Sequence, residues 1–344
     1  MSEPRMARRD FLQSTLAAGA AISLGESLLA AQSDDAAGLP TRPLGKTGER
    51  VSILCLGGWH IGKAGTELGE ERAVALMHEA LDSGMTFWDN AWDYHDGYSE
   101  ELMGKALKGR RDRVFLMTKN CHTDYQGSMS NLEDSLRRMQ TDRIDLWQFH
   151  EMNYDNDPDW VFERDGIKAA LEAQKAGKVR YIGFTGHKDP RIHLKMLGKP
   201  YPWATAQMPI NVMDYHFRSF QQQVVPECLR QGVAPIGMKS LAGSPDGQNG
   251  RLPSEGIATA EECIRYALSL PIASLVVGIR NRKDLEQDLA VARGFQPYDT
   301  EKLAALRHRV ADRAGDGRHE LFKSTQRFDG PHHRKLHEFE VETT

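Results

Sequence analysis

Short apolar runs alternate with amphipathic stretches along most of the chain, which predicts β-strands and α-helices in turn. In the first amphipathic stretch, Ala73, Leu76, Met77 and Ala80 recur at helical spacing, and Gly84 ends it. The apolar runs predict strands at residues 53–56, 114–118, 144–149, 179–184, 204–208, 233–236 and 273–277, with one more beginning at residue 87. The amphipathic stretches predict helices at about 73–81, 99–109, 130–139, 166–176, 190–197, 220–231, 259–269 and 282–293. Eight strand–helix units favour a closed α/β barrel over an open sheet.

The regions that flank these units predict additions to a (β/α)8 TIM barrel. Residues 44–52 contain a glycine turn typical of a β-hairpin before the first strand. A further helix is predicted at about 300–313, within a C-terminal tail that starts near residue 295. This tail could form a lid over the barrel or a contact with another subunit. His332, His333 and His337 would suit a metal site, but solvated histidines are the favoured interpretation.

The N-terminal residues predict export. Arg8 and Arg9 precede a short, alanine-rich apolar run and a small-residue cleavage site at 28–31, which resembles a twin-arginine (Tat) signal. Residues 1–38 are therefore predicted to be signal peptide and linker, and 39–344 the barrel with its tail. The apolar run is too short for a membrane span. The prediction is a periplasmic protein that meets the Tat translocase, and the alternative is a disordered tail.

Composition excludes some functions. The chain has 344 residues with 27% charged side chains and a net charge of -4, so no broad basic surface for nucleic acid is indicated. Its four cysteines form no CxxC pair, which disfavours an iron–sulfur cluster or structural zinc, and no metal site is predicted. The sequence does not decide the oligomeric state, and a homo-oligomer is one possibility.

Ionisable residues follow three successive predicted strands. Asp89 and Tyr94 come after the second strand, Lys119 after the third and His150 after the fourth. The carboxyl ends of barrel strands share one face, so these side chains are expected to meet there. Reduction of a carbonyl needs a proton from a positioned acid, and a tyrosine beside an ammonium can supply it. A carboxylate could anchor the lysine, and a histidine could orient the carbonyl oxygen.

The arrangement resembles the aldo/keto reductase family, whose motifs match at 88–91, Tyr94, 97–100, 118–119 and 145–150. The resemblance extends over about residues 41–293. It implies that Tyr94 is the general acid/base, Lys119 lowers its pKa, Asp89 anchors the lysine and His150 orients the substrate. The implied reaction is reversible reduction of an aldehyde or ketone to an alcohol.

The resemblance also implies a nicotinamide cofactor, with NADP(H) favoured and NAD(H) possible. Arg280 is the expected partner of the 2′-phosphate. The chain departs from the family pattern at Gly186, which replaces an asparagine, and at 236–241, which contains no stacking tyrosine. Asp288 likewise stands where related chains often have asparagine. The predicted cofactor residues are Gly58, Trp59, Thr185, Gln207, Met238, Lys239, Gly278, Arg280, Gln287 and Asp288.

Aromatic and hydrogen-bonding residues on the predicted loops of the same face suggest a substrate pocket. They suit a polar ligand with apolar faces, such as a sugar, and equally an aromatic aldehyde. The predicted substrate residues are Trp59, His60, Trp92, His95 and Tyr125.

Three functions stay open at this point. The first is an NAD(P)(H)-dependent oxidoreductase. The second is a reductase-like binding or regulatory protein that holds cofactor without significant turnover, which the departures at Gly186 and Met238 and the predicted export favour. The third is an enzyme that retains its cofactor while it oxidises and re-reduces one sugar-like substrate.

Overall fold

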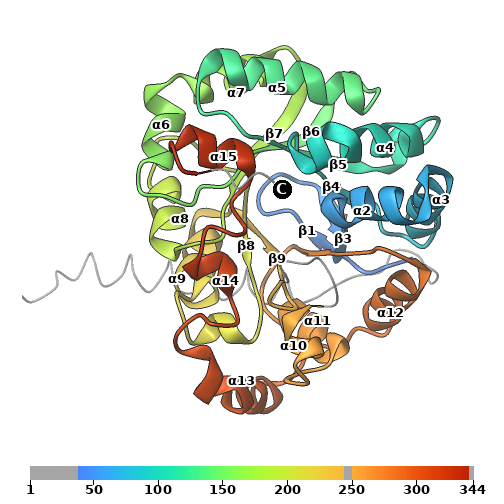
Figure 1. Cartoon of the computed structure of the whole chain (residues 1–344), viewed down its shortest axis with the longest axis vertical. Helices are drawn as coiled ribbons and strands as arrows, with labels where there is room; N and C mark the ends of the chain where they lie inside the picture. Colours follow the sequence, from blue (N-terminus) through green and yellow to red (C-terminus); the bar gives the residue numbers. More distant parts are fainter. Residues whose placement is uncertain (1–37, 244–249, 341–344) are drawn as a thin grey trace, which may run out of the picture.

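The computed structural model describes residues 38–243 and 250–340, so the predicted Tat signal lies outside the described residues. Eight parallel strands close into a barrel in the order β10-β3-β4-β5-β6-β7-β8-β9 (Figure 1). These strands are β3 (Leu54–Gly57), β4 (Phe87–Asp89), β5 (Phe115–Asn120), β6 (Ile144–Phe149), β7 (Val179–Thr185), β8 (Thr205–Pro209), β9 (Ala234–Met238) and β10 (Ser274–Val277). The predicted (β/α)8 fold is confirmed.

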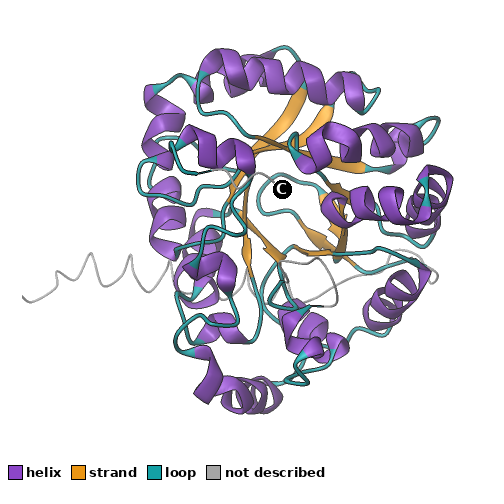
Figure 2. Cartoon of the chain, in the orientation of Figure 1, coloured by secondary structure: helices purple, strands orange, loops and turns teal. Residues whose placement is uncertain are grey.

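The predicted helices surround the barrel (Figure 2). They are α3 (Glu70–Asp82), α4 (Tyr98–Leu107), α5 (Tyr125–Arg138), α7 (Gly166–Lys175), α8 (Pro190–Leu197), α9 (Phe220–Gln231), α11 (Ala260–Leu268) and α12 (Arg282–Arg293). Within the barrel, three further helices of the described residues were not predicted: α2 (Gly58–Leu68), α6 (Asp157–Glu163) and α10 (Arg251–Ser254). As a result Trp59 and His60, which were expected on a loop, lie in the first turn of α2.

The predicted hairpin consists of β1 (Thr41–Pro43) and β2 (Arg50–Ser52), paired antiparallel. Arg42 is fully buried and attaches this hairpin to the barrel. Its guanidinium donates to the carbonyl oxygens of Ile272 at 2.8 Å and Leu268 at 2.7 Å. These carbonyls lie before β10, so the hairpin sits at the amino-terminal end of the strands.

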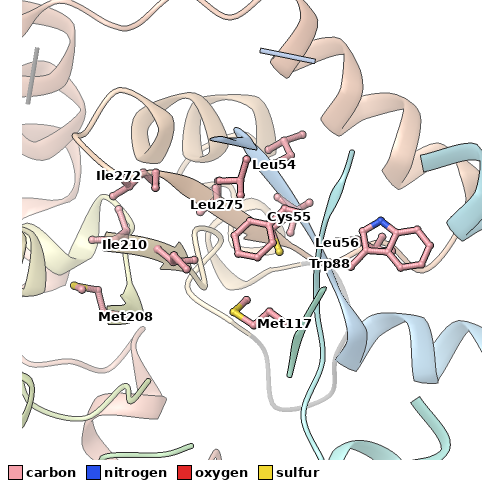
Figure 3. Close-up of a cluster of buried hydrophobic side chains, with 14 of the residues drawn as sticks. Leu54, Cys55, Leu56, Trp88, Met117, Met208, Ile210, Ile272 and Leu275 are labelled. Atoms are coloured by element: carbon pink, nitrogen blue, oxygen red, sulfur yellow. The ribbon is translucent and has the colours of Figure 1, made fainter. Parts of the chain in front are cut away.

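A large cluster of buried hydrophobic side chains packs among the described strands, and Figure 3 shows part of it. Cys55 and Leu56 on β3 pair with Phe87 and Trp88 on β4, and all four side chains are buried. Burying a side chain of this size stabilises the fold by about 1.5–3 kcal/mol. The cluster therefore fixes the position of Asp89, the next residue of β4.

The C-terminal tail returns to the barrel. It contains α13 (Thr300–Ala314), α14 (Leu321–Ser324) and α15 (Pro331–Leu336), and α15 lies beside α6 (Figure 1). On α14, buried Lys323 donates to Asp214 at 2.7 Å. The structure contradicts the prediction of solvated tail histidines, because His333 is buried. No helix among the described residues is long and apolar enough to cross a membrane.

Candidate active site

Lys119, at the end of β5, is buried at the centre of the site. Its ammonium donates to Asp89 Oδ1 at 2.5 Å, to the carbonyl oxygen of Asn90 at 2.6 Å and to the Tyr94 hydroxyl oxygen at 3.3 Å. A lysine ammonium has three donors and no acceptor, so all three are used. Because the Tyr94 oxygen accepts from Lys119, the phenolic proton is left to be donated elsewhere.

The pKa of Tyr94 differs from the prediction. Burial raises it well above its ordinary value, and the negative charges of Asp89, Asp93 and Glu151 add to the rise. Burial of the phenol is the largest cause of this rise, and the Asp89 carboxylate, which is paired with the Lys119 ammonium, acts in the same direction.

His150 follows β6, and its ring lies edge-on to Tyr94 with ring centroids 5.7 Å apart. His150 Nδ1 is 3.4 Å from Asp93 Oδ1 and also 3.4 Å from Cys121 Sγ. The structure thus brings together Asp89, Tyr94, Lys119 and His150 as predicted from the strand ends. Sequence reasoning missed Asp93 and Cys121, although each lies within two residues of a predicted site residue.

Gln207 on β8 orients Asp89. Its side-chain amide donates to Asp89 Oδ2 at 3.3 Å, and its carbonyl oxygen accepts from Gln148 at 2.6 Å. Thr185 pairs with Gln207 across β7 and β8, and both are buried. Gln207 was predicted to contact the carboxamide of the cofactor. Its side-chain amide is therefore already hydrogen-bonded to Asp89, the residue that anchors Lys119.

The departure at Gly186 has a steric reason. A Cβ at this position would lie 2.2 Å from the carbonyl oxygen of Met152, which is closer than any real contact. The neighbouring backbone is fixed, because the Met152 N–H donates to the Thr185 carbonyl oxygen at 2.7 Å. An asparagine cannot occupy residue 186 unless the loop after β6 moves.

The aromatic rings of Trp59 and His95 lie beside Tyr94. Trp59 is 43% exposed, although tryptophan is usually well buried. Its ring lies edge-on to Tyr94 at 5.4 Å and stacks on His95 at 4.5 Å. His95 Nε2 is 2.8 Å from the Trp59 carbonyl oxygen, so ring and backbone are held together. Trp59 and His95 therefore adjoin the site as predicted for substrate residues.

The other predicted substrate residues lie in different surroundings. Trp92 packs against the tail, with its ring 5.4 Å from that of His332. The Tyr125 hydroxyl donates to Glu172 on α7 at 2.6 Å, so the structure does not bring that hydroxyl to Tyr94. His60 lies beneath the turn after β10, where a Cβ at residue 278 would come within 2.5 Å of its ring.

The tail is anchored over the site by Asp329. Its buried carboxylate accepts from Lys188 at 2.6 and 2.8 Å and from the Tyr154 hydroxyl at 2.6 Å. The backbone N–H of the following residue, Gly330, donates to both carboxylate oxygens of Glu151 at 3.0 Å. These partners follow β6 and β7, so the tail forms the lid that the sequence left as one alternative.

Lys239 lies under the same lid. It follows β9 in a left-handed conformation with φ 57°, and its ammonium lies 5.7 Å from the Phe322 ring and 5.8 Å from the Phe328 ring. Burial lowers the pKa of Lys239 to about 8. Met238, the last residue of β9, and Lys239, which follows it, thus present a thioether and a cation where related chains carry an aromatic residue.

The turn after β10 has features of an anion site. Gly278 is exposed, and α12 begins at Arg282 with Asn281 as its N-cap, accepting from the Asp284 N–H at 3.1 Å. Helix N-termini favour negative charge. The Arg280 guanidinium donates to both oxygens of Glu67 on α2, at 2.9 and 2.7 Å. Glu67 therefore already accepts hydrogen bonds from the Arg280 guanidinium that is expected to bind a 2′-phosphate.

The two predicted adenine-side residues differ from each other. Gln287 is exposed on α12, whereas Asp288 is buried. Burial raises the pKa of Asp288 to about 8. Burial therefore favours the uncharged form of Asp288, in which it resembles the asparagine of related chains.

Comparisons with known proteins agree with this geometry. The aldo/keto reductase family model matches residues 53–252. Uncharacterized oxidoreductase YrpG of Bacillus subtilis (strain 168) is 32% identical over 244 residues, 63% of this chain and 71% of that protein. L-galactose dehydrogenase of Arabidopsis thaliana is 30% identical over 282 residues, 72% of this chain and 86% of that protein.

Solved structures share the fold. Aldo-keto reductase AKR11C1 from Bacillus halodurans (holo form) has a TM-score of 0.66 at 25% identity, covering 82% of this chain and 99% of that one. An aldo/keto reductase from Klebsiella pneumoniae, in complex with NADP and acetate, has a TM-score of 0.64 at 22% identity, covering 78% and 94%. The family match, the relatives and the barrel together show that this chain belongs to the aldo/keto reductase family, a family of oxidoreductases.

Proposed function

We propose that the chain is an NADP(H)-preferring enzyme that interconverts an aldehyde or ketone and the corresponding alcohol, with Tyr94 as the general acid/base. The observation that carries the proposal is the Lys119 ammonium, which donates to Asp89, Asn90 and the Tyr94 oxygen together. This geometry leaves the phenolic proton for a substrate oxygen. Consumption of NADPH by the purified protein, when it is offered a panel of aldehydes and ketones, tests the proposal.

The residues present fit a nicotinamide dinucleotide at the exposed Gly278 turn, where the N-terminus of α12 favours an anion. When bound, a reduced nicotinamide supplies hydride to the carbonyl carbon. The carbonyl π bond breaks, and the oxygen takes the Tyr94 proton. Because burial and nearby carboxylates raise the pKa of Tyr94, it keeps this proton at neutral pH until the oxygen becomes basic. The role proposed for His150 is to orient that oxygen.

A sugar-like substrate is supported by two observations. The exposed ring of Trp59, stacked on His95, offers an apolar face with polar neighbours beside Tyr94. The chain is also similar to a protein named L-galactose dehydrogenase, and the similarity extends over 72% of this chain and 86% of that protein. We propose a small polyhydroxylated aldehyde or alcohol as the substrate class, with Trp59 against its apolar face.

Replacement of Arg280 by alanine is expected to weaken NADPH binding by about 10- to 150-fold, and NADH binding much less. Loss of one charged hydrogen-bonding contact costs about 1.5–3 kcal/mol, and only NADPH carries the 2′-phosphate. Dissociation constants measured by fluorescence titration with each nucleotide check this. Equal losses for both nucleotides would show that Arg280 does not bind the phosphate.

Glu67→Gln is the matched control, because Glu67 holds the same guanidinium through both carboxylate oxygens. Removing this negative charge should strengthen NADPH binding relative to NADH, the opposite direction to Arg280→Ala. A weaker preference for NADPH in Glu67→Gln would mean that Glu67 serves to orient Arg280 for the phosphate.

We also propose export through the twin-arginine pathway, since Arg8 and Arg9 precede a short apolar run. Replacing both arginines with lysine is expected to trap unprocessed precursor in the cytoplasm. Fractionation of cells that produce the wild-type and double-mutant chains measures this. Normal periplasmic processing of the double mutant would rule out the pathway.

A further inference from the structure

Three ligand-type side chains converge beside Tyr94, and the reductase chemistry gives a role to His150 but none to the other two. Asp93 follows β4, Cys121 follows β5 and His150 follows β6. Each offers one atom, and these atoms all lie within 4.8 Å of one another. They come from three neighbouring strand ends, so the barrel itself holds them together.

Hydrogen bonds account for only part of this cluster. The contact of 3.4 Å between Cys121 Sγ and His150 Nδ1 is a sulfur hydrogen bond, whereas His150 Nδ1 also lies 3.4 Å from Asp93 Oδ1. A good N–H···O hydrogen bond spans about 2.7–3.2 Å. Asp93 Oδ1 is buried and has no hydrogen-bond partner among the described residues. A buried carboxylate oxygen without a donor is energetically costly, so its position needs another cause.

The spacing matches the ligands of a tetrahedral ion. Zinc binds thiolate at about 2.3 Å and imidazole or carboxylate at about 2.0–2.2 Å, so adjacent ligand atoms lie roughly 3.4–3.6 Å apart. Both separations from His150 Nδ1 are 3.4 Å. One sulfur, one nitrogen and one oxygen ligand also suit zinc better than magnesium or calcium, which prefer oxygen ligands alone.

We propose that Asp93 Oδ1, Cys121 Sγ and His150 Nδ1 bind one Zn²⁺ ion, with the fourth position available to water or a substrate oxygen. Three protein ligands with one open position are typical of catalytic zinc. The ring of Tyr94 lies edge-on to that of His150, so the ion is adjacent to the proposed acid. Binding of the ion is independent of the proposed function, whereas polarisation of a carbonyl oxygen by the ion rests on it.

Two other ligand clusters fit an ion less well. In the first, Asp157 Oδ1 lies 2.6 Å from His337 Nε2, and Oδ2 accepts from the N–H groups of Asn153 and Tyr154 at 2.8 and 2.7 Å. Its carboxylate is thus satisfied by ordinary hydrogen bonds. The second contains Asp329, whose charge is paired with the Lys188 ammonium at 2.6 Å. A second cation there would be repelled.

Metal stoichiometry tests the proposal. The purified full-length protein is stripped with chelator, incubated with Zn²⁺, freed of unbound ion and assayed by mass spectrometry of the metal, without nucleotide or substrate. We expect one ion per chain, and affinity weaker by on the order of 100-fold or more in Cys121→Ser and in Asp93→Ala. Cobalt substitution should also give a sulfur-to-metal charge-transfer band that Cys121→Ser lacks.

Two matched variants locate the ion. Cys228→Ser removes a buried thiol on α9, and His337→Ala removes a ligand of the Asp157 cluster; both should keep one ion per chain. Each variant is checked by circular dichroism, and the two ligand variants serve independently should one fail to fold. Substoichiometric zinc in the wild type, zinc retained in both ligand variants, or zinc lost from His337→Ala would each overturn the proposal. Failure of NADPH turnover would leave this result unchanged.

Discussion

Replacement of Tyr94 by phenylalanine is expected to lower kcat by about 10²- to 10⁴-fold, the usual contribution of a positioned general acid. The change removes only the hydroxyl, whose oxygen accepts from Lys119 at 3.3 Å. Folding and nucleotide binding should survive, because the ring still packs against Trp59 and His150. Steady-state kinetics on the true substrate, with nucleotide affinity measured separately, check the prediction.

A second tyrosine provides the control for loss of a hydroxyl. Tyr201 donates to Gln174 at 3.1 Å, and Gln174 lies on the outer helix α7. Tyr201→Phe is therefore expected to keep wild-type kcat. If Tyr94→Phe also kept near-wild-type turnover, the family resemblance would describe the fold and another group would deliver the proton.

Replacement of Asp329 by alanine is expected to destabilise the protein by about 3–5 kcal/mol, the usual cost of removing one partner from a buried ion pair. In the wild type the Lys188 ammonium donates to both Asp329 oxygens. In the variant it would remain buried without its charge partner. Because Asp329 holds the lid over the site, KM should rise as well. Urea unfolding and limited proteolysis of the tail measure the stability effect.

The double variant Asp329→Ala/Lys188→Met separates the ion pair from loss of packing. It removes both charges, so it should be more stable than Asp329→Ala alone. Two results together would contradict this: a loss of stability below about 1 kcal/mol for Asp329→Ala, and a loss in the double variant equal to the sum of the two single losses. They would show that the pair behaves as an exposed surface pair and that the lid is held by other contacts.

The barrel and four site residues could be predicted because their signals are local. A buried strand shows as an apolar run, and the residue after it lies on the shared carboxyl-end face. This rule placed Asp89, Lys119 and His150 together. Helix α2 was missed because Gly58, Gly62 and Gly65 resemble a loop. They are needed for packing, since a Cβ on Gly62 would lie 2.2 Å from the His95 ring.

The contacts that hold the lid and the candidate zinc ligands could not be predicted, since their partners are distant in the sequence. Asp329 bonds to Lys188, 141 positions away. Cys121 and His150 are 29 positions apart, and no fixed spacing marks them as a pair. Nor could the pKa direction of Tyr94 be predicted, because burial of the phenol, the largest cause, and the nearby carboxylates act on it only through the fold.

The central claim is hydride transfer from a nicotinamide to a carbonyl carbon, with the proton supplied by Tyr94. The most direct measurement follows deuterium from NADPH labelled at the transferred position, with the purified protein and its aldehyde or ketone substrate. We predict deuterium bound to carbon in the alcohol product, in an amount equal to the NADPH consumed, and almost none with Tyr94→Phe over the same time. Tight binding of NADPH without deuterium in any product of the substrate panel would contradict the account and favour a binding or regulatory protein.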